Sequence, residues 1–284
     1  MVKIITDTTS CLEPAFASRF RIPVIPQIIH FGEETFYEGI QLDHAGFIER
    51  LKTAPELPKT AAPPPELFRE QFELLVPLGE PIICIHPSAE VSGTVRAASV
   101  AAQDFPGADI RIIDTRLIAS PLASLVHLAV DWAEAGLNAD TIEKNIREMI
   151  SRCRIYFLVA TLDYLVKGGR IGGAAALLGS MLQIKPILTF IDGKVDQFER
   201  ERTHKRAMNR LVEIVCESYP KGKSGYLTVM QGGVPDQGYQ LAEELSSLLD
   251  IAEISVYDMP PAIITHGGPG IIGVGFFTSP NSSY

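Results

Sequence analysis

The sequence predicts an α/β protein built from two domains. Its 284 residues, 46% of them hydrophobic, suit two domains of ordinary size. In the first half, short β-branched runs alternate with helical patterns, which favours a mainly parallel sheet covered on both sides. In the second half, Asp192-Gly193 is a hairpin signal and implies antiparallel pairing. We expect an N-terminal α/β/α domain over residues 1–160 and a C-terminal α/β domain with a mixed sheet over residues 161–284.

The first half supplies strands and helices in alternation. The expected strands are Lys3–Thr6, Pro23–Ile29, Pro81–Ile85, Asp109–Ile113 and Ile155–Ala160. Phe68 and Phe72 recur at helical spacing and predict a helix over Glu66–Leu75. Ser120-Pro121 is typical of a helix start, Gly136 of its end, and Asn138 of the start of the next helix. Thr53–Pro65 contains five prolines and is expected to be a stiff surface loop.

The second half has a different pattern. Two strands, Pro186–Ile191 and Val195–Glu199, flank the hairpin signal. Helices are expected over Thr203–Tyr219 and Asp236–Leu249, with strands over Gly225–Met230 and Ile254–Tyr257. This pattern predicts a mixed sheet with helices on one side.

Composition and charge argue against several classes of function. The formal net charge of −9 gives no positive field that would attract nucleic acid. The cysteines are far apart and form no C-x-x-C pair, which favours reduced thiols over disulfides or a zinc site. They are Cys11, Cys84, Cys153 and Cys216. We therefore expect a cytoplasmic protein without a metal or a cofactor.

No membrane-spanning segment or signal peptide is expected. The N-terminus enters a short strand directly and lacks the long apolar core of a signal peptide. The apolar stretch 172–191 is interrupted by Lys185-Pro186, which favours a helix, a turn and a strand. Contact with a membrane is expected to be transient and at its surface.

The segment Pro87–Thr94 is the most informative for function, because Ser92-Gly93-Thr94 lies between a buried strand and an alanine-rich helix. Hydroxyls and backbone N–H groups at a strand-to-helix turn can hold one anion, and the helix dipole favours it. The alternative is that Ser92 or Thr94 only caps the helix.

Other segments can contribute to the same kind of site. Asp7–Ser10 and Asp114-Thr115 follow strands, and the carboxyl ends of parallel strands form the ligand edge of a sheet. Lys59–Pro63 lies in the proline-rich loop, which can fold over that edge. In the second half, Leu162–Ile171 is a helical turn ended by glycines, and Thr265–Gly270 places a histidine beside glycines. Each of these segments is also typical of an ordinary turn, cap or structural histidine.

Together these segments resemble the DegV family of bacterial lipid-binding proteins, some of which are the fatty-acid-binding subunits of fatty acid kinase. The resemblance covers nearly the whole chain. Its elements are Asp7-Thr8-Thr9-Ser10, Thr60 with Pro63, Ser88-x-x-x-Ser92-Gly93-Thr94, Asp114-Thr115, Leu162-x-x-Leu165-x-x-Gly168-Gly169-Arg170-Ile171, Ile184-Lys185-Pro186-Ile187 and His266-x-Gly268-Pro269-Gly270.

The resemblance implies a fatty acid in a tunnel at the interface of the two domains, with no catalytic residue. It implies that Thr60, Ser92 and His266 hold the carboxylate. The neighbours expected beside them are Gly93, Thr94 and Gly268. The expected ligand is a long-chain fatty acid of roughly C14–C18, because burying its many methylene groups contributes favourable free energy of binding. Where the family often has T-S-Q-P, this chain has Thr60-Ala61-Ala62-Pro63, so two polar side chains are missing.

Apolar residues near the motifs are candidates for the acyl-chain tunnel, and each can equally be plain core. They are Ile28, Ile118, Leu162, Leu165 and Ile187. A basic cluster stands out in this acidic chain, and within it Arg202 and Arg206 are candidates for docking the kinase. The full cluster is Arg200, Arg202, His204, Lys205, Arg206 and Arg210. A solvated helix face is the alternative. The chain has no phosphate-binding loop or kinase signature of its own.

Two rival functions remain. In the first, the protein is a hydrolase or acyltransferase with Ser92 or Ser88 as nucleophile and His266 as base. The chain contains no G-x-S-x-G motif, which argues against it. In the second, the protein binds another small carboxylic acid. A non-catalytic lipid-binding protein is the preferred interpretation.

Overall fold

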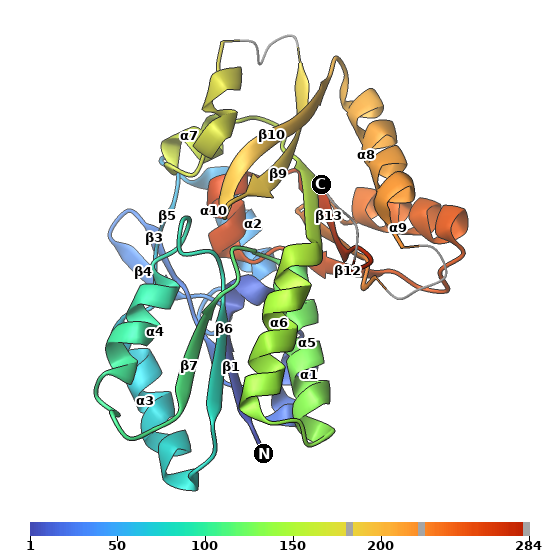
Figure 1. Cartoon of the computed structure of the whole chain (residues 1–284). Coiled ribbons are helices and arrows are strands. Elements are labelled where there is room, and N and C mark those ends of the chain that lie inside the picture. The colour runs from blue at the N-terminus through green and yellow to red at the C-terminus, as the bar shows by residue number, and fades with distance from the viewer. Residues whose placement is uncertain (180–183, 221–224, 281–284) are drawn as a thin grey trace. The chain divides into compact units, whose positions relative to one another are not determined.

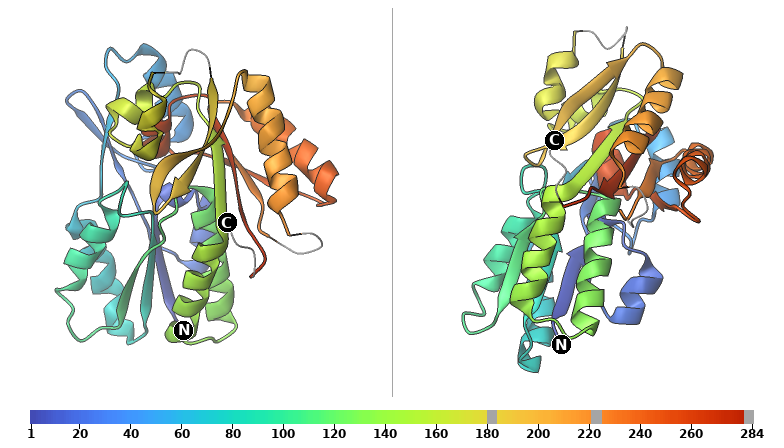
Figure 2. Two further views of the ribbon diagram at one scale, coloured as in Figure 1. Left: turned by 45° about the horizontal axis from the view of Figure 1, so that its top comes forward. Right: turned by 45° about the vertical axis from the view of Figure 1, so that its right-hand side comes forward.

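The computed structural model describes residues 1–179, 184–220 and 225–280. The chain forms two compact units, Met1–Ser151 and Arg152–Tyr284 (Figures 1 and 2). Among the residues described, none of the helices has both the length and the apolar character needed to cross a bilayer.

The first unit is built on a parallel four-stranded sheet in the order β2-β1-β6-β7. Its strands are β1 (Lys3–Asp7), β2 (Val24–Ile25), β6 (Ile82–His86) and β7 (Ile110–Asp114). Helices α3 (Pro65–Leu75) and α4 (Thr94–Ala102) cover one face, and α1 (Pro14–Phe20), α5 (Ser120–Glu134) and α6 (Ala139–Arg152) cover the other (Figure 1). The predicted α/β/α unit with a parallel sheet is confirmed.

The core on the α3 side follows from the helical spacing of two phenylalanines. Phe68 and Phe72 are one turn apart on α3, and both are fully buried. They pack against Ile5 and Cys84 of the sheet and Ala98 of α4. Small residues on α4 let the two helices and the sheet approach closely. The first unit is completed by η1 (Thr8–Ser10), α2 (His44–Thr53) and η2 (Val76–Leu78).

A second, antiparallel sheet in this unit was not foreseen. The expected strand Pro23–Ile29 is in fact two strands, because β2 ends at Ile25 and β3 (Ile28–Phe31) pairs elsewhere. Strand β3 lies between β4 (Glu34–Tyr37) and β5 (Lys59–Ala61). Pro26 lies at the break, where it can donate no ladder hydrogen bond.

Strand β5 also corrects the expectation that Thr53–Pro65 is only a loop. Three residues without proline, Lys59–Ala61, can donate N–H groups and pair with β3. The pairing places Thr60 opposite Ile29. Thr60 is therefore held on a strand.

The second unit contains a six-stranded mixed sheet in the order β10-β9-β8-β13-β11-β12. The strands are β8 (Cys153–Leu158), β9 (Lys185–Ile191), β10 (Lys194–Glu201), β11 (Thr228–Gly232), β12 (Ser255–Asp258) and β13 (Ile271–Phe277). Only β11 and β12 pair in parallel. Asp192 and Gly193 have φ values of 50° and 81°, as a two-residue hairpin turn of type I′ requires. The predicted mixed sheet and its hairpin are confirmed.

The position of β8 differs from the sequence-based boundary near residue 160. That boundary leaves the expected strand Ile155–Ala160 with the first domain. In the structure β8 pairs with β13 and β9, so it belongs to the sheet of the second unit. An apolar run predicts a strand but carries no information about its partner.

Two long helices cover one face of the second sheet. Helices α8 (His204–Ser218) and α9 (Pro235–Leu249) contribute Leu211 and Leu241 to a core that includes Val229 and Ile272. The short helices lie on the other side of this sheet (Figures 1 and 2). They are α7 (Asp163–Lys167), η3 (Gly172–Leu177) and α10 (Pro261–Gly267). The expectation of helices on one side therefore holds only for α8 and α9. In the stretch 172–191, η3 and β9 are described, and residues 180–183 lie outside the described residues.

Candidate functional site

The Ser92-Gly93-Thr94 turn follows β6 and leads into α4 at the carboxyl edge of the parallel sheet. Gly93 is the N-cap residue of α4, and no side chain caps the helix there. Ser92 Oγ instead lies 2.8 Å from Thr94 Oγ1 and accepts a hydrogen bond from the Thr94 backbone N–H at 3.3 Å. Thr94 is buried, whereas Ser92 is partly exposed. The two hydroxyls thus form a pair of which one member remains accessible.

A buried polar network lies behind this pair. Gln27 Nε2 donates to Thr94 Oγ1 at 2.9 Å and to Asp7 Oδ1 at 3.1 Å. Asp7 Oδ1 also accepts from the backbone N–H and the hydroxyl of Thr9, at 3.0 and 2.6 Å. His86 Nδ1 lies 2.7 Å from Asp7 Oδ2. Because both Asp7 and His86 are fully buried, these donors offset the cost of removing the carboxylate from water.

The proline-rich segment lies against the same turn. A Cβ atom added to Gly93 would stand 3.1 Å from Ala62 Cβ, so Gly93 leaves the space into which Ala62 packs. Thr60 is half-buried on β5, two residues before that contact. The first unit therefore brings the Thr60 segment and the Ser92 turn together. At Ala62 a methyl group packs against this turn.

Asp114-Thr115, at the same edge, has a structural role. Asp114 Oδ1 accepts from the backbone N–H groups of Ala89 and Arg116, at 3.2 and 2.9 Å. The Thr115 hydroxyl donates to the His86 carbonyl at 2.7 Å. These bonds fix the turns after β6 and β7.

In the second unit, two motifs almost a hundred residues apart pack against each other through α7 and α10. A Cβ atom at Gly168 would stand 2.1 Å from His266 Nδ1. A Cβ atom at Gly268, where φ is +80°, would stand 2.5 Å from the Tyr164 ring. Only glycine fits at these positions, and the contact at Gly168 fixes the place of the His266 ring.

Burial lowers the pKa of His266 to about 4, and the nearby positive charge of Arg170 adds to this effect. At neutral pH the ring is therefore neutral. It can donate one N–H to a ligand oxygen but supplies no positive charge. Leu162 and Leu165, from the same glycine-ended segment, are buried.

The remaining tunnel candidates occupy different environments. Ile28 and Ile118 are half-buried in the first unit. Ile187 is fully buried and belongs to the core beneath α8 and α9 in the second unit. Its environment is that of a core residue.

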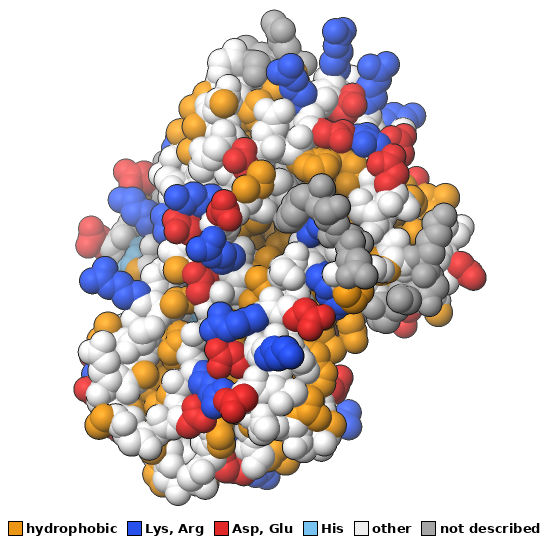
Figure 3. Space-filling view, viewed as in Figure 1, with side chains coloured by type: hydrophobic (Ala, Val, Ile, Leu, Met, Phe, Trp, Pro, Cys, Tyr) orange, Lys and Arg blue, Asp and Glu red, His pale blue; other side chains and the backbone are white. Residues whose placement is uncertain are grey.

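The basic cluster lies around the start of α8, where Figure 3 shows a group of Lys and Arg side chains. Arg202 and Arg206 are exposed. Arg210 differs from them, because it forms ion pairs with Glu199, Glu213 and Glu217. The charges available to a partner are therefore those at the end of β10 and in the first turn of α8.

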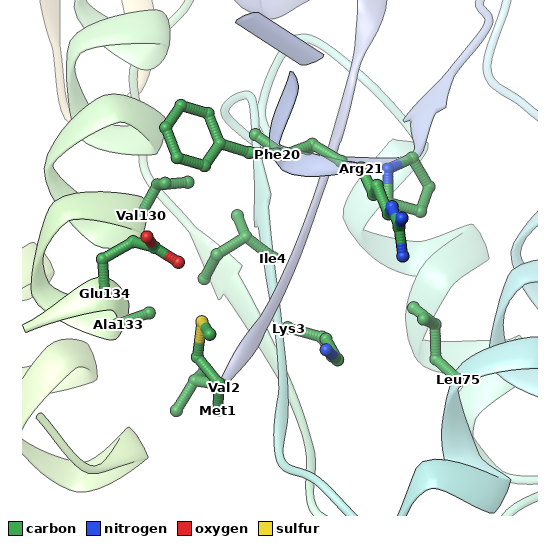
Figure 4. Close-up of a pocket in the computed structure, with 12 residues that line it drawn as sticks. Met1, Val2, Lys3, Ile4, Phe20, Arg21, Leu75, Val130, Ala133 and Glu134 are labelled. Atoms are coloured by element: carbon green, nitrogen blue, oxygen red, sulfur yellow. The ribbon is translucent and has the colours of Figure 1, made fainter. Parts of the chain in front are cut away.

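A small pocket in the first unit lies at the opposite end of the parallel sheet, beside the amino end of β1. In Figure 4, Val130 and Glu134 of α5 face Ile4, and Met1 and Phe20 complete the rim. Its volume is about 60 Å³. Ligand pockets occupy roughly 300–1,000 Å³, so this one is too small for an acyl chain. Within the described part of the chain, no group of three or more His, Cys, Asp or Glu residues could hold a metal ion.

Two members of the buried network, Gln27 and His86, were not predicted from the sequence. Both are single polar residues at the ends of apolar runs, Ile25-Pro26 before Gln27 and Ile82–Ile85 before His86. A polar residue at the end of a buried strand is a usable signal, since it must find a hydrogen-bond partner. Its partner could not be identified from the sequence, because Gln27, Asp7 and Thr94 are far apart along the chain.

Comparison with known proteins identifies the family over nearly the whole chain. The family model described as "Uncharacterised protein, DegV family" matches residues 1–279. The chain belongs to the DegV family. A DegV domain-containing protein from Halalkalibacterium halodurans is 35% identical over 277 residues, covering 97% of this chain and 98% of the relative.

Solved structures of DegV family members have the same fold. A fatty acid binding DegV family protein from Streptococcus agalactiae matches with a TM-score of 0.90 and 27% identity, covering 98% of this chain and 99% of the other. DegV from Bacillus subtilis, described as a fatty acid binding protein, matches with a TM-score of 0.89 and 29% identity over the same shares.

Proposed function

We propose that this DegV family member binds one long-chain fatty acid without transforming it. Thr60, Ser92 and His266 hold the carboxylate, and apolar residues near their motifs line a tunnel for the acyl chain. Gly93, Thr94 and Gly268 adjoin these residues. Ile28, Ile118, Leu162 and Leu165 supply apolar surface for the chain, and Ile187 supports it from the core.

The observation that carries the proposal is the similarity in fold to DegV proteins described as fatty acid binding, together with the accessible hydroxyl at Ser92. The Ser92 turn precedes α4, whose N-terminal dipole favours a carboxylate. His266 is neutral at neutral pH, so the site offers directed hydrogen bonds. Such a site orients an anion while leaving it available to another protein.

The two ends of the ligand contribute free energies of binding of different size. Burying about 14 methylenes at ~0.8 kcal/mol each gives a gross term near 11 kcal/mol before the costs of association. A hydrogen bond to a charged group contributes roughly 1.5–3 kcal/mol. The apolar surface therefore dominates affinity, and the hydroxyls decide which end of the ligand enters the polar site.

Native mass spectrometry of protein purified without added lipid tests the proposal. We expect an added mass that matches a fatty acid of roughly C14–C18, removable by delipidation and restored by hexadecanoate. Ser92→Ala should weaken rebinding by about tenfold, since one charge-assisted hydrogen bond is lost. Ser99→Ala removes an exposed hydroxyl from the same helix and serves as the control. Protein that carries no acyl mass and binds no hexadecanoate contradicts the proposal, and a smaller carboxylic acid in its place favours the second rival.

The second part of the proposal is that the bound carboxylate is presented to a separate fatty acid kinase. Arg202 and Arg206 are exposed beside the first turn of α8, where they can meet an acidic partner. The double variant Arg202→Glu/Arg206→Glu should lower acyl-phosphate formation by the matching kinase and leave hexadecanoate affinity unchanged. A matched reversal in the first unit, Lys52→Glu/Lys144→Glu, controls for net charge. If both double variants support equal acyl-phosphate formation, Arg202 and Arg206 do not dock the kinase.

No specific observation favours the hydrolase alternative. The hydroxyl partner of Ser92 Oγ is Thr94 Oγ1. Ester turnover by the purified protein that disappears in Ser92→Ala would reverse this preference.

A further inference from the structure

We propose that Asp7 and Gln27 are positioning residues that fix the direction of the hydrogen bonds at the Ser92-Thr94 pair, so that Ser92 donates its proton outward and selects a carboxylate over an alcohol. The inference rests on the proposed fatty-acid site. It concerns how that site distinguishes one polar head group from another.

Asp7 sets the direction of the hydrogen bonds, because a carboxylate can only accept them. Asp7 Oδ1 lies 3.1 Å from the end of the Gln27 side chain, so the amide must turn its NH₂ group toward Asp7. The same NH₂ group reaches Thr94 Oγ1 at 2.9 Å. Gln27 is 3% exposed, so water does not compete for this arrangement.

The orientation of the Gln27 amide decides where the hydroxyl protons of Thr94 and Ser92 point. Thr94 Oγ1 accepts from Gln27, and its remaining hydroxyl contact is Ser92 Oγ at 2.8 Å. Thr94 therefore gives its single proton to Ser92. Ser92 Oγ also accepts from the Thr94 backbone N–H at 3.3 Å. With two donors directed at its oxygen, Ser92 keeps its own proton for an acceptor outside the pair.

The consequence is a site with a fixed polarity. Within the residues described, the hydrogen bonds of the Ser92 hydroxyl are those with Thr94, and the side chain is partly exposed. A carboxylate can only accept, which matches an outward-directed O–H. An alcohol gains no such advantage, because it can bind a hydroxyl in either direction. Selectivity for the carboxylate thus originates at Gln27, which is separated from the ligand by Thr94 and Ser92.

The affinities of delipidated protein for hexadecanoate and for hexadecanol, measured by displacement of a fluorescent acyl probe, test the inference. Gln27→Met keeps the length of the side chain and removes its NH₂ group, so the Ser92-Thr94 pair can reverse. We expect hexadecanoate affinity to fall by about 5- to 10-fold, with hexadecanol affinity within about 2-fold of the parent protein.

Thr94 gives an independent arm if Gln27→Met folds poorly. Thr94→Val removes the hydroxyl with little change in shape and should lower the acid-to-alcohol preference by about 3- to 5-fold. Thr94→Ser should restore the preference, and Ser99→Ala should leave it unchanged. Equal losses for acid and alcohol in Gln27→Met and Thr94→Val would show a purely structural role and overturn the inference, as would no change in either variant.

A different set of affinities is expected if the proposed carboxylate site, and not the positioning role, is wrong. If the parent protein binds no hexadecanoate, or if Ser92→Ala binds it as tightly as the parent, the proposed carboxylate site itself is wrong. If Ser92→Ala loses acid binding selectively while the Gln27 and Thr94 variants do not, only the positioning role is wrong.

Discussion

The two units hold their candidate ligand-binding residues by different physical means. In the first unit, the Ser92 hydroxyl is fixed through Thr94 and Gln27 to the buried carboxylate of Asp7. In the second unit, the His266 ring abuts Gly168 so closely that an added Cβ would stand 2.1 Å from its Nδ1 atom. One group is positioned by directional hydrogen bonds and the other by shape.

This difference predicts that the two units respond differently to substitutions. A hydrogen-bonded group depends on the presence of each donor and acceptor, since a buried polar atom that loses its partner is costly. A group positioned by packing depends on volume, because interiors have little free space for an added methyl. Removing a polar atom should therefore damage the first unit more, and adding a methyl should damage the second unit more.

Asp7→Ala should have the largest effect. It leaves His86, Gln27 and Thr9 with buried donors that lack their acceptor. Each buried donor left without an acceptor costs about 1–3 kcal/mol, so the free energy of unfolding in urea should fall by at least about 3 kcal/mol. Asp131→Ala, at an exposed position on α5, should change it by no more than about 0.5 kcal/mol. A loss below about 1 kcal/mol for Asp7→Ala would show that the network does not hold the first unit's site.

His266 gives the next largest effect, as a dependence of stability on pH. Its pKa is lowered from 6.5 to about 4 in the folded protein, so below pH 6.5 the unfolded chain takes up a proton that the folded chain refuses. Stability is therefore lost as pH falls from 6.5 to 4, by at most about 3 kcal/mol. His266→Gln should remove this part of the pH dependence in urea unfolding of the delipidated protein.

The exposed His204 provides the control for that experiment. His204→Gln should keep the pH dependence of the parent protein, since its environment is solvent in the first turn of α8. If the free energy of unfolding changes equally with pH in the parent protein and in His266→Gln between pH 4 and 6.5, the ring is not held neutral by burial.

The sequence predicted the fold class because apolar periodicity reports local structure directly. Phe68 and Phe72 marked α3, and Asp192-Gly193 marked the hairpin of β9 and β10. Partners were harder to predict, since strand pairing joins segments that are distant along the chain. For that reason neither the pairing of β8 with β13 nor the antiparallel sheet of β3, β4 and β5 was foreseen.

The same limit applies to the candidate site. The segments of Ser92 and His266 carry recognisable polar and glycine patterns, and the resemblance to DegV proteins then implied that these two residues hold the carboxylate. Gln27 and His86 were missed, because each acquires its role only through contact with Asp7. Nor could the sequence indicate why Gly168 is a glycine, because the reason is the position of a ring on α10.

The smallest predicted effect tests the shape-based half of the comparison. Gly168→Ala forces the His266 ring to move, and overpacking of this kind costs about 1–3 kcal/mol in the free energy of unfolding. It should also lower hexadecanoate affinity, because the displaced ring no longer meets the carboxylate. Gly179→Ala is the matched control in the second unit, since a Cβ atom there meets nothing within 4 Å.

The same methyl added in the first unit should matter less. At Gly93 it meets only Ala62 Cβ at 3.1 Å, a contact that a small shift of the loop relieves. A Gly168→Ala protein that matches Gly179→Ala in both stability and affinity would remove the steric account of His266. If Gly93→Ala loses more stability and affinity than Gly168→Ala, the comparison between the units is reversed. Packing is then the stronger constraint at the Ser92 turn as well.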